Sequence, residues 1–270
     1  MFTVAIGNEK GGAGKTTTTA NLAAVAGAAG LRVLVVDADP QGQLSDYCFG
    51  VDPRPGLSLG ELLDASIANR PSLDAVRLRH VVPGVDLLPA DRAPLERAEA
   101  EMGRDPLNGL GALRVLLAQV QDEYDLALID TPPRLLGLTT GALVAADAAV
   151  VVMSPTTLHF AGATAFIEKV RQVGASPLNP NLQLLGVLFN AVDKTAEETS
   201  VIAAMVEAEG WPIFAARVPQ SRLASKANLS QTPVVLAYPK NPVTEGFRAA
   251  ADELMEQLAA MPDVLAGEAR

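Results

Sequence analysis

The chain has 270 residues, of which 49% are hydrophobic, and a formal net charge of −10 at pH 7. Its single cysteine and two histidines exclude an intramolecular disulfide and argue against a zinc site of the usual Cys/His kind. No run approaches the roughly 18 apolar residues of a membrane-spanning helix, and the acidic balance confines any nucleic-acid contact to a local basic patch.

Short apolar runs alternate with longer segments rich in Ala and Leu. Several of these runs are apolar at nearly every position, which is typical of parallel strands covered by helices on both faces. The predicted strands are Phe2–Ile6, Arg32–Val36, Val85–Leu88, Leu126–Ile129, Ala148–Met153, Leu184–Phe189 and Pro212–Ala215. The predicted helices are Lys15–Ala29, Gly109–Gln121, Leu136–Ala146, Thr157–Gln172, Ala196–Glu209 and Thr244–Ala260.

This alternation predicts a three-layer, doubly wound α/β fold with a mostly parallel sheet and right-handed crossovers. The segment Val51–Asp105 is less regular, and we interpret it as an elaboration of the same domain, so residues 1–270 are expected to form a single domain. The sequence leads from Met1 straight into the first strand, without the basic and long apolar regions of a signal peptide. The protein is therefore expected to be cytoplasmic.

A glycine-rich loop joins the first predicted strand to the first helix, where residues 9–17 read EKGGAGKTT. Backbone N–H groups of such a loop can surround phosphate oxygens, and the dipole of the following helix favours their negative charge. The residues expected to hold the nucleotide are Gly11, Gly12, Ala13, Gly14, Lys15, Thr16 and Thr17. Lys15 would reach the β- and γ-phosphates, Thr16 would ligate Mg²⁺, and Thr17 would hold the α-phosphate. A turn that merely caps a helix would explain neither the Gly-Lys-Thr ending nor the preceding strand.

The loop departs from the strict phosphate-loop pattern, because Glu9 stands at its first glycine and Lys10 follows. It resembles the deviant Walker A motif, KGGxGKT, of the ParA/MinD family of ATPases; Ala13 stands where that family commonly has Val. The resemblance implies that Lys10 reaches across a nucleotide-sandwich homodimer and supplies positive charge to the partner's phosphates, as an arginine finger does. Outside this context, Lys10 could equally be a solvated surface lysine.

Aspartates follow two further strands. Residues 37–43 read DADPQGQ and resemble the family's DxDPQG motif, with Gln43 where relatives usually carry Asn. By this resemblance, Asp39 orients the attacking water and Asp37 lies near the metal. A later apolar strand ends in Asp130, followed by Thr-Pro-Pro, as expected of a Walker B carboxylate that holds Mg²⁺, usually through water. Three motifs in this order indicate an ATPase that uses ATP and Mg²⁺.

Later segments extend the resemblance with less specific patterns. Asn190 ends a strand at the position where relatives contact adenine, and Pro219 lies in a segment that resembles the late nucleotide-site loop of ParA proteins. Residues 232–235, TPVV, resemble the strand that comes after it. Gln231 stands where relatives usually have Gly, so this loop is expected to differ.

The resemblance to ParA-like proteins implies nonspecific DNA binding by the ATP-bound homodimer, association with the nucleoid, and a ParB-like or cargo-adaptor partner that stimulates hydrolysis. A DNA surface needs Lys and Arg to neutralise phosphates. Arg222 and Lys226 fall where relatives place DNA contacts, although a solvated polar face would explain either residue equally well. The other basic candidates are Lys169, Arg171, Lys194, Arg217, Lys240 and Arg248.

Other branches of the family fit less well. Cys48 alone cannot supply the cluster cysteines of nitrogenase-type or iron–sulfur carrier ATPases. Residues 250–258 present an acidic polar face, which disfavours a MinD-like membrane helix. A terminal tyrosine cluster is absent, and the loop begins too close to Met1 for an operator-binding helix-turn-helix to precede it.

We therefore predict an ATP-dependent dimeric switch that partitions a chromosome or plasmid and does not bind membranes. Three alternatives remain open at this point. The same machine could position a protein cargo, such as a chemoreceptor cluster or a protein compartment. It could be a MinD-like membrane regulator. It could also be a metabolic P-loop enzyme, such as a biotin- or cobalamin-pathway ligase, although no second-substrate pocket is evident.

Overall fold

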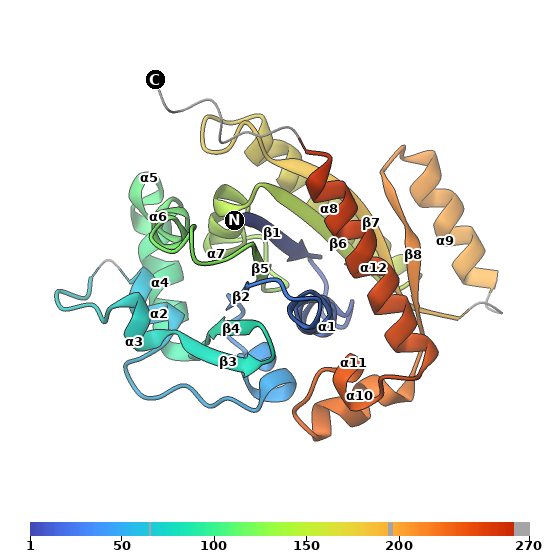
Figure 1. Cartoon of the computed structure of the whole chain (residues 1–270). Coiled ribbons are helices and arrows are strands. Elements are labelled where there is room, and N and C mark those ends of the chain that lie inside the picture. Colours follow the sequence, from blue (N-terminus) through green and yellow to red (C-terminus); the bar gives the residue numbers. More distant parts are fainter. Residues whose placement is uncertain (65, 194–196, 262–270) are drawn as a thin grey trace.

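In the described part of the chain, the seven apolar runs and one further strand, β3, form a sheet of eight strands in the order β3-β4-β2-β5-β1-β6-β7-β8 (Figure 1). The structure, a computed structural model, describes residues 1–64, 66–193 and 197–261. The strands are β1 (Phe2–Gly7), β2 (Val33–Asp37), β3 (Leu78–Val82), β4 (Val85–Leu88), β5 (Leu126–Asp130), β6 (Ala148–Met153), β7 (Gln183–Val192) and β8 (Ile213–Pro219). Neighbouring strands are parallel except for the antiparallel pair β3–β4. The predicted mostly parallel sheet is confirmed.

Helices connect the strands and cover both faces of the sheet. They are α1 (Lys15–Ala28), the π-helix η1 (Leu44–Cys48), α2 (Leu59–Leu63), α3 (Leu73–Val76), α4 (Arg92–Arg104), α5 (Pro106–Gly109), α6 (Ala112–Ala118), α7 (Gly137–Ala145), α8 (Thr157–Gly174), α9 (Glu197–Ala208), α10 (Arg222–Leu229), α11 (Val234–Ala237) and α12 (Pro242–Ala259).

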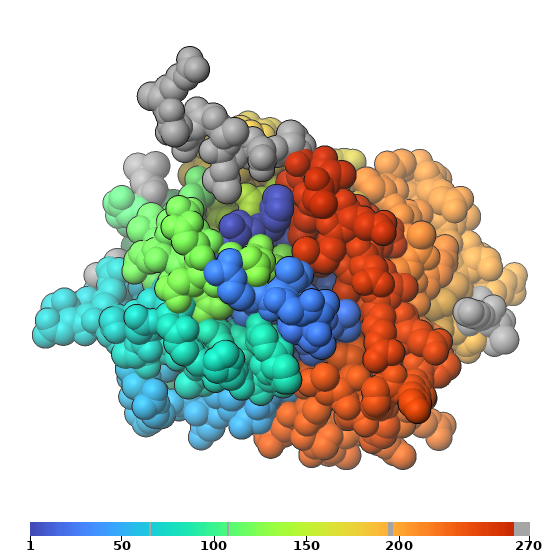
Figure 2. Space-filling model, viewed as in Figure 1, coloured from blue at the N-terminus to red at the C-terminus, as the bar shows by residue number. Residues whose placement is uncertain are grey.

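Alternate residues of the central strands face opposite helical layers, as the period of a strand requires. Val4 and Ile6 of β1 lie in one core with residues of α1 and α12. Ala5 between them lies in another core with Phe166 of α8. On that same side, α2, α4 and α6 cover the half of the sheet that contains β2 and β5. Figure 2 shows α1, in blue, beside α12, in red, on one face of the molecule. The predicted three-layer α/β fold is therefore confirmed.

The irregular segment Val51–Asp105 is richer in structure than the sequence indicated. It contains α2, α3, the β3–β4 hairpin and the 13-residue helix α4. Asp91 caps α4 by accepting a hydrogen bond from Ala93 N–H, and the helix buries one stripe that includes Leu95 and Met102. Strand β3 lies at the edge of the sheet with its central residues exposed, so it lacks the apolar run that identified the other strands.

Two sequence predictions differ from the structure, and a third falls partly outside the described residues. Of the helix predicted over 109–121, only residues 112–118 form a helix, α6; Gly109 ends the preceding α5, and the chain turns at Leu110–Gly111. Residues 232–235 were expected to form a strand, but Val234 and Val235 begin the short helix α11, which Pro233 precedes. The predicted start of α9 at Ala196 lies outside the described residues; the described helix begins at Glu197.

The amino ends of β2 and β5 are joined by an ion pair. Asp125 accepts hydrogen bonds from Arg32 N–H at 2.8 Å and from the Arg32 guanidinium at 2.7 and 3.2 Å. These bonds to Arg32 lower the pKa of Asp125 to about 2. The pair lies opposite the edge at which the predicted site residues collect, because those residues follow the carboxyl ends of the strands.

Candidate active site

The glycine-rich loop follows β1 and leads directly into α1. Gly12 and Gly14 adopt φ angles of 80° and 94°, a region that favours glycine. A Cβ atom on Gly14 would lie 1.9 Å from Asn190 Nδ2. The same amide donates a hydrogen bond to Ala13 O at 3.2 Å. Asn190 of β7 therefore packs directly against the backbone of this loop, and its predicted contact with adenine stays a prediction.

Lys15 is the first residue of α1 and only 6% exposed. Its Nζ donates to Lys10 O at 3.2 Å. Burial lowers the pKa of Lys15, and the negative charges of Asp130 and Asp39 oppose this shift. A buried ammonium group beside two carboxylates and a phosphate loop is suited to binding an anion.

Asp37 and Asp130 end the adjacent strands β2 and β5 and are direct partners in their register. Thr16 Oγ1 donates to Asp130 Oδ2 at 2.7 Å, while Asp130 Oδ1 is buried without a hydrogen-bond partner among the described residues. Burial, reinforced by Asp37, raises the pKa of Asp130 well above its usual range. A carboxylate oxygen left without a donor in a buried site fits a cation or its bound water.

Asp37 is already held by the protein. Its Oδ2 accepts bonds from Ser45 N and Oγ at 2.9 and 2.7 Å, and its Oδ1 accepts one from Asp39 N at 3.3 Å. Burial nevertheless raises the pKa of Asp37 to about 7. Asp37 thus lies beside the candidate metal position with both oxygens engaged. Within the described ranges no group of three or more His, Cys, Asp or Glu side chains could hold a metal by itself, but Mg²⁺ commonly uses one or two carboxylates with phosphate oxygens and water.

Asp39 is 8% exposed and accepts a hydrogen bond from Gln41 N–H at 2.9 Å. Burial raises its pKa, and the positive charges of Lys15, Arg134 and Arg92 oppose the shift. A cavity of about 230 Å³ adjoins it, lined by Asp39, Pro40, Gln41, Glu96, Glu99, Pro132, Pro133 and Arg134. Neither Arg92 nor Arg134 belongs to a motif that was predicted from the sequence. Arg134 could have been found, because it directly follows the Thr-Pro-Pro segment.

The Lys10 side chain differs from that of Lys15. It is 38% exposed and forms a single loose ion pair, with Glu9 at 3.6 Å. Three residues that contact the backbone around it were also missed by the sequence analysis: Asn8, His159 and Gly162. His159 Nε2 lies 3.2 Å from Gly11 O.

Cys48, the only cysteine, lies in η1 and is 3% exposed. Burial raises the pKa of its thiol, and the charges of Asp130 and Asp37 raise it further. The π-helix thus packs against the carboxylates from the side of Ser45 and Cys48. Helices of this kind are often found at functional sites.

The remaining predicted residues lie in two places. Pro219 ends β8 and pairs with Val192 of β7, the strand that carries Asn190. Arg222 and Lys226 are exposed, lie one turn apart on α10, and form no hydrogen bond or ion pair with another described side chain. The candidate Lys194 lies outside the described residues.

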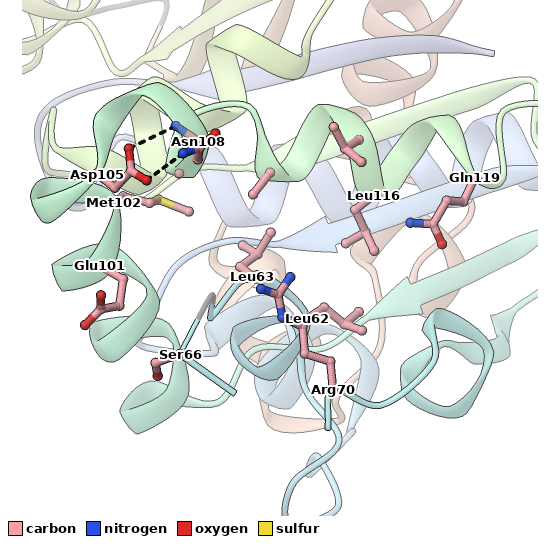
Figure 3. Close-up of a pocket in the computed structure, with 13 residues that line it drawn as sticks. Leu62, Leu63, Ser66, Arg70, Glu101, Met102, Asp105, Asn108, Leu116 and Gln119 are labelled. Carbon is pink, nitrogen blue, oxygen red and sulfur yellow. Dashed lines mark hydrogen bonds between the residues drawn. The ribbon is translucent and has the colours of Figure 1, made fainter. Parts of the chain in front are cut away.

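A cavity of about 460 Å³ lies away from these residues (Figure 3). It is bounded by α2, α4, α5 and α6, with Leu62, Leu63 and Leu116 among its apolar residues. Asp105 and Asn108 are hydrogen-bonded to each other at one end of it. It contains none of the predicted site residues. Separately, no helix in the described part of the chain is long and apolar enough to cross a membrane.

Comparisons with known proteins agree with this geometry. A family model described as an AAA domain matches residues 1–184. The chain is 34% identical to chromosome partitioning protein ParA of Caulobacter vibrioides over 241 residues, 86% of each chain. It is 34% identical to the chromosome-partitioning ATPase Soj of Thermus thermophilus over 261 residues, 94% of this chain and 96% of Soj.

Among solved structures, cobyrinic acid a,c-diamide synthase from Mycobacterium smegmatis, with a bound ATP analogue and magnesium, is similar with a TM-score of 0.81. It is 29% identical in sequence, and 96% of each chain is covered. The glycine-rich loop with its additional lysine, the aspartates at two adjacent strand ends and the extended similarity to ParA and Soj lead to one assignment. The chain belongs to the ParA/MinD family of P-loop ATPases, as a ParA-like member.

Proposed function

We propose that this ParA-like ATPase is an ATP-dependent homodimeric switch that binds DNA nonspecifically and partitions a chromosome or plasmid. The observation that carries the proposal is the contrast between two lysines of one loop. Lys15 is buried among the carboxylates, whereas the Lys10 side chain is 38% exposed and only loosely paired with Glu9. Lys15 suffices for a nucleotide bound in cis. Lys10 is therefore available for the phosphates of a second protomer.

The residues fit ATP and Mg²⁺. The unpaired Asp130 Oδ1 suits the cation or its water, and the left-handed backbone of Gly12 and Gly14 gives the loop the tight turn that a phosphate loop needs. Mg²⁺, when bound, neutralises the charge of the phosphate oxygens. The residues proposed to hold the phosphates and the cation are Gly11, Gly12, Ala13, Gly14, Lys15, Thr16, Thr17 and Asp130, with Asp37 beside them. Asn190 and Pro219 would contact the base from the ends of β7 and β8.

Asp39 would orient the water that attacks the terminal phosphate. Its carboxyl group lies at the cavity between the Asp37–Gln43 segment and the Pro132–Arg134 segment, where water can enter. Burial raises the pKa of Asp39, so its carboxylate is a better hydrogen-bond acceptor than a solvated one. Lys10 of the partner protomer would supply positive charge on the opposite side of the phosphates.

The DNA-binding part of the proposal rests on α10 and on the named relatives, which are chromosome-partitioning proteins. Arg222 and Lys226 place two unpaired positive charges on one face of that helix. A DNA surface made of a few such side chains would explain how a chain with a net charge of −10 binds DNA only when two copies combine. A ParB-like partner would then stimulate hydrolysis and release the DNA.

The proposal is tested by measuring size by chromatography and DNA binding by fluorescence anisotropy. Each is measured with ATP, with ADP and for Lys10→Ala. We expect a DNA-binding dimer only with ATP, and monomers for Lys10→Ala. Lys169→Ala, which removes a lysine of α8, is the charge-matched control for dimerisation. Monomers that never bind DNA in ATP would overturn the proposal, and ATP-dependent binding to anionic vesicles would favour a membrane regulator instead.

One other activity has a specific observation in its favour, because the similar solved structure is a cobyrinic acid a,c-diamide synthase. An amide-forming ligase would turn over ATP only with its second substrate and would not need Lys10. ATP turnover that appears only when such a second substrate is added, and that is unchanged in Lys10→Ala, would favour this alternative. Positioning of a protein cargo would instead preserve every ATP-dependent result and differ only in the partner that stimulates hydrolysis.

A further inference from the structure

Glu9 and Gly11 contact α8 through their backbones, and Lys10 is bonded to Asn8, which is itself bonded to α8. Glu9 N–H donates to Gly162 O at 3.3 Å, and Lys10 N–H donates to Asn8 Oδ1 at 2.9 Å. Gly11 O lies 3.2 Å from His159 Nε2. The loop is thus held by α8 on the side of Lys10, in addition to its attachment to β1 and α1.

Asn8 forms the centre of this arrangement. Its side chain is fully buried, and its Nδ2 donates to Val152 O at 3.0 Å and to His159 O at 3.2 Å. Its Oδ1 accepts the N–H of Lys10, so both ends of the amide are used. One side chain therefore ties the loop to the end of β6 and to the first turn of α8. Such fully satisfied buried networks fix one geometry.

Gly162 allows the loop to approach α8 closely. A Cβ atom on Gly162 would lie 2.2 Å from Asn8 Oδ1, 2.6 Å from Lys10 Cγ and 3.0 Å from Lys10 N. Any larger residue would push against the backbone of Lys10 as well as its side chain. Gly162 thus lets the loop lie closer to α8 than any residue with a Cβ atom would allow.

His159 holds the other side of Lys10. Because Gly11 O can only accept, the proton of the contact belongs to His159 Nε2. Nδ1 lies 3.1 Å from Thr156 Oγ1, which also accepts the N–H of His159 at 3.3 Å as the cap of α8. In the neutral ring the Thr156 hydroxyl therefore donates to Nδ1. Nε2 keeps its proton whether the ring is neutral or charged.

The Lys10 side chain has none of these restraints. Its backbone N–H is bound to Asn8 and its carbonyl accepts from Lys15 Nζ, while the side chain has only the loose contact with Glu9. The root of the side chain is therefore held by the protein, whereas its charged end has only the 3.6 Å contact with Glu9. A fixed root reduces the conformational freedom that must be lost when a group is brought to its target.

We infer that Asn8, His159 and Gly162 are positioning residues that hold the backbone of Lys10 so that its side chain is presented to a second copy of this chain. This inference rests on the role proposed for Lys10. It adds that presentation of Lys10 depends on the amino end of α8, whereas nucleotide binding in cis depends on Lys15, Thr16 and Asp130. The two requirements should be separable by mutation.

The test compares His159→Phe, which keeps a ring but removes the donor, with His159→Gln, which restores an N–H donor. Both variants are measured for nucleotide affinity, ATP-dependent dimerisation and kcat. We expect His159→Phe to lower dimerisation and kcat by about tenfold or more, as small misplacements of reacting groups do, with unchanged nucleotide affinity. His159→Gln should recover most of the loss. Thr164→Ala, an exposed α8 position near Gly162, is the matched control.

Gly162→Ala tests the same inference without altering the ring. It should also lower dimerisation and kcat at unchanged nucleotide affinity, because the added methyl group displaces the Lys10 backbone. Thermal unfolding checks that each variant folds; if His159→Phe does not, the Gly162 variant decides the question.

Four results would overturn the inference. The first is wild-type kcat and dimerisation in both His159→Phe and Gly162→Ala. If Lys10→Ala abolishes dimerisation and kcat in the same experiments, the proposed function stands and only the positioning role fails. A parallel loss of nucleotide affinity would show that α8 supports the whole loop rather than Lys10. Failure of His159→Gln to recover activity would exclude the hydrogen bond as the cause. Wild-type dimerisation and kcat in Lys10→Ala would contradict both the proposed function and this inference.

Discussion

Gln231 Nε2 donates a hydrogen bond to Asp46 Oδ1 at 3.1 Å, which joins the loop between α10 and α11 to the π-helix beside the active site. Gln231 adopts a φ angle of 50°, in the left-handed region that favours glycine. It also packs on Gly50, where an added Cβ atom would lie 3.1 Å from Gln231 Oε1. The glutamine is thus held in an unfavourable backbone conformation by its contacts with Asp46 of η1 and with Gly50.

This strain predicts an order of stability at position 231. Gln231→Ala loses the bond to Asp46 and keeps the left-handed backbone, whereas Gln231→Gly loses the bond and relieves the strain. We expect the Gly variant to be more stable than the Ala variant by about 1 kcal/mol, measured by urea denaturation. Equal stability of the two would mean that the backbone relaxes when the bond to Asp46 is lost.

The proposed role of Asp39 predicts a trapped state. Asp39→Ala should bind ATP and dimerise but hydrolyse ATP at a rate reduced by about 100-fold or more, because the attacking water loses its acceptor. Single-turnover measurements with radiolabelled ATP and chromatography in ATP would test this. The wild type in ADP, which should stay monomeric, is the control. Unchanged turnover would show that Asp39 does not position the water.

The close approach of Asn190 predicts that Gly14 tolerates no side chain. Gly14→Ala should abolish tight nucleotide binding and lower the free energy of unfolding by about 1–2 kcal/mol or more, since a left-handed alanine is added to a steric clash. Gly11→Ala is the matched control for stability, because no heavy atom lies within 4 Å of its added Cβ. Similar thermal stabilities of the two variants would contradict this account.

The ion pair of Arg32 and Asp125 predicts an acid-sensitive contribution to stability. The pKa of Asp125 is lowered to about 2 in the folded chain and lies near 3.9 in an unfolded one. At pH values between these two, the unfolded state binds more protons, so stability falls as the pH decreases from about 4 to about 2. Asp125→Asn should flatten the dependence of Tm on pH in that window. An unchanged slope would mean that the exposed pair contributes nothing measurable.

The exposed cations of α10 predict a salt-dependent effect on DNA binding. Arg222→Ala and Lys226→Ala should each weaken ATP-dependent binding to unrelated DNA sequences by a similar factor and reduce the salt slope by about 1. ATP turnover without DNA should be unchanged. Arg70→Ala, which removes an arginine from the distant cavity of Figure 3, is the control. Normal salt slopes in both α10 variants would place the DNA surface elsewhere.

The sequence predicted the parts of the molecule that repeat a strong pattern. The seven apolar strands and the long helices were found because covered parallel strands are continuously apolar. Strand β3 was missed because its central Arg79 and His80 are exposed at the edge of the sheet. Helix α4 was missed because it buries only a narrow stripe and begins at Arg92, after its cap Asp91, within a region rich in Pro and Gly.

In the candidate site, too, the residues in local motifs were predicted, and those brought together by tertiary packing were not. Lys15, Thr16 and Asp130 stand in motifs whose order alone predicts that they meet, and the structure brings them together. Asn8 and His159 are 151 residues apart, and the contact that joins them depends on the packing of α8 against the loop. No local pattern marks such a pair. The engagement of both Asp37 oxygens likewise depends on the turn that returns Ser45 to the end of β2.

The position of Cys48 gives the protein a natural reporter. Its thiol is buried in η1 beside the carboxylates, with its pKa raised, and it is the only cysteine in the chain. A thiol reagent can modify it only when this segment opens. The labelling rate of the unaltered protein therefore measures how often the wall of the nucleotide site opens, and ligands that close the site should slow it without any introduced probe.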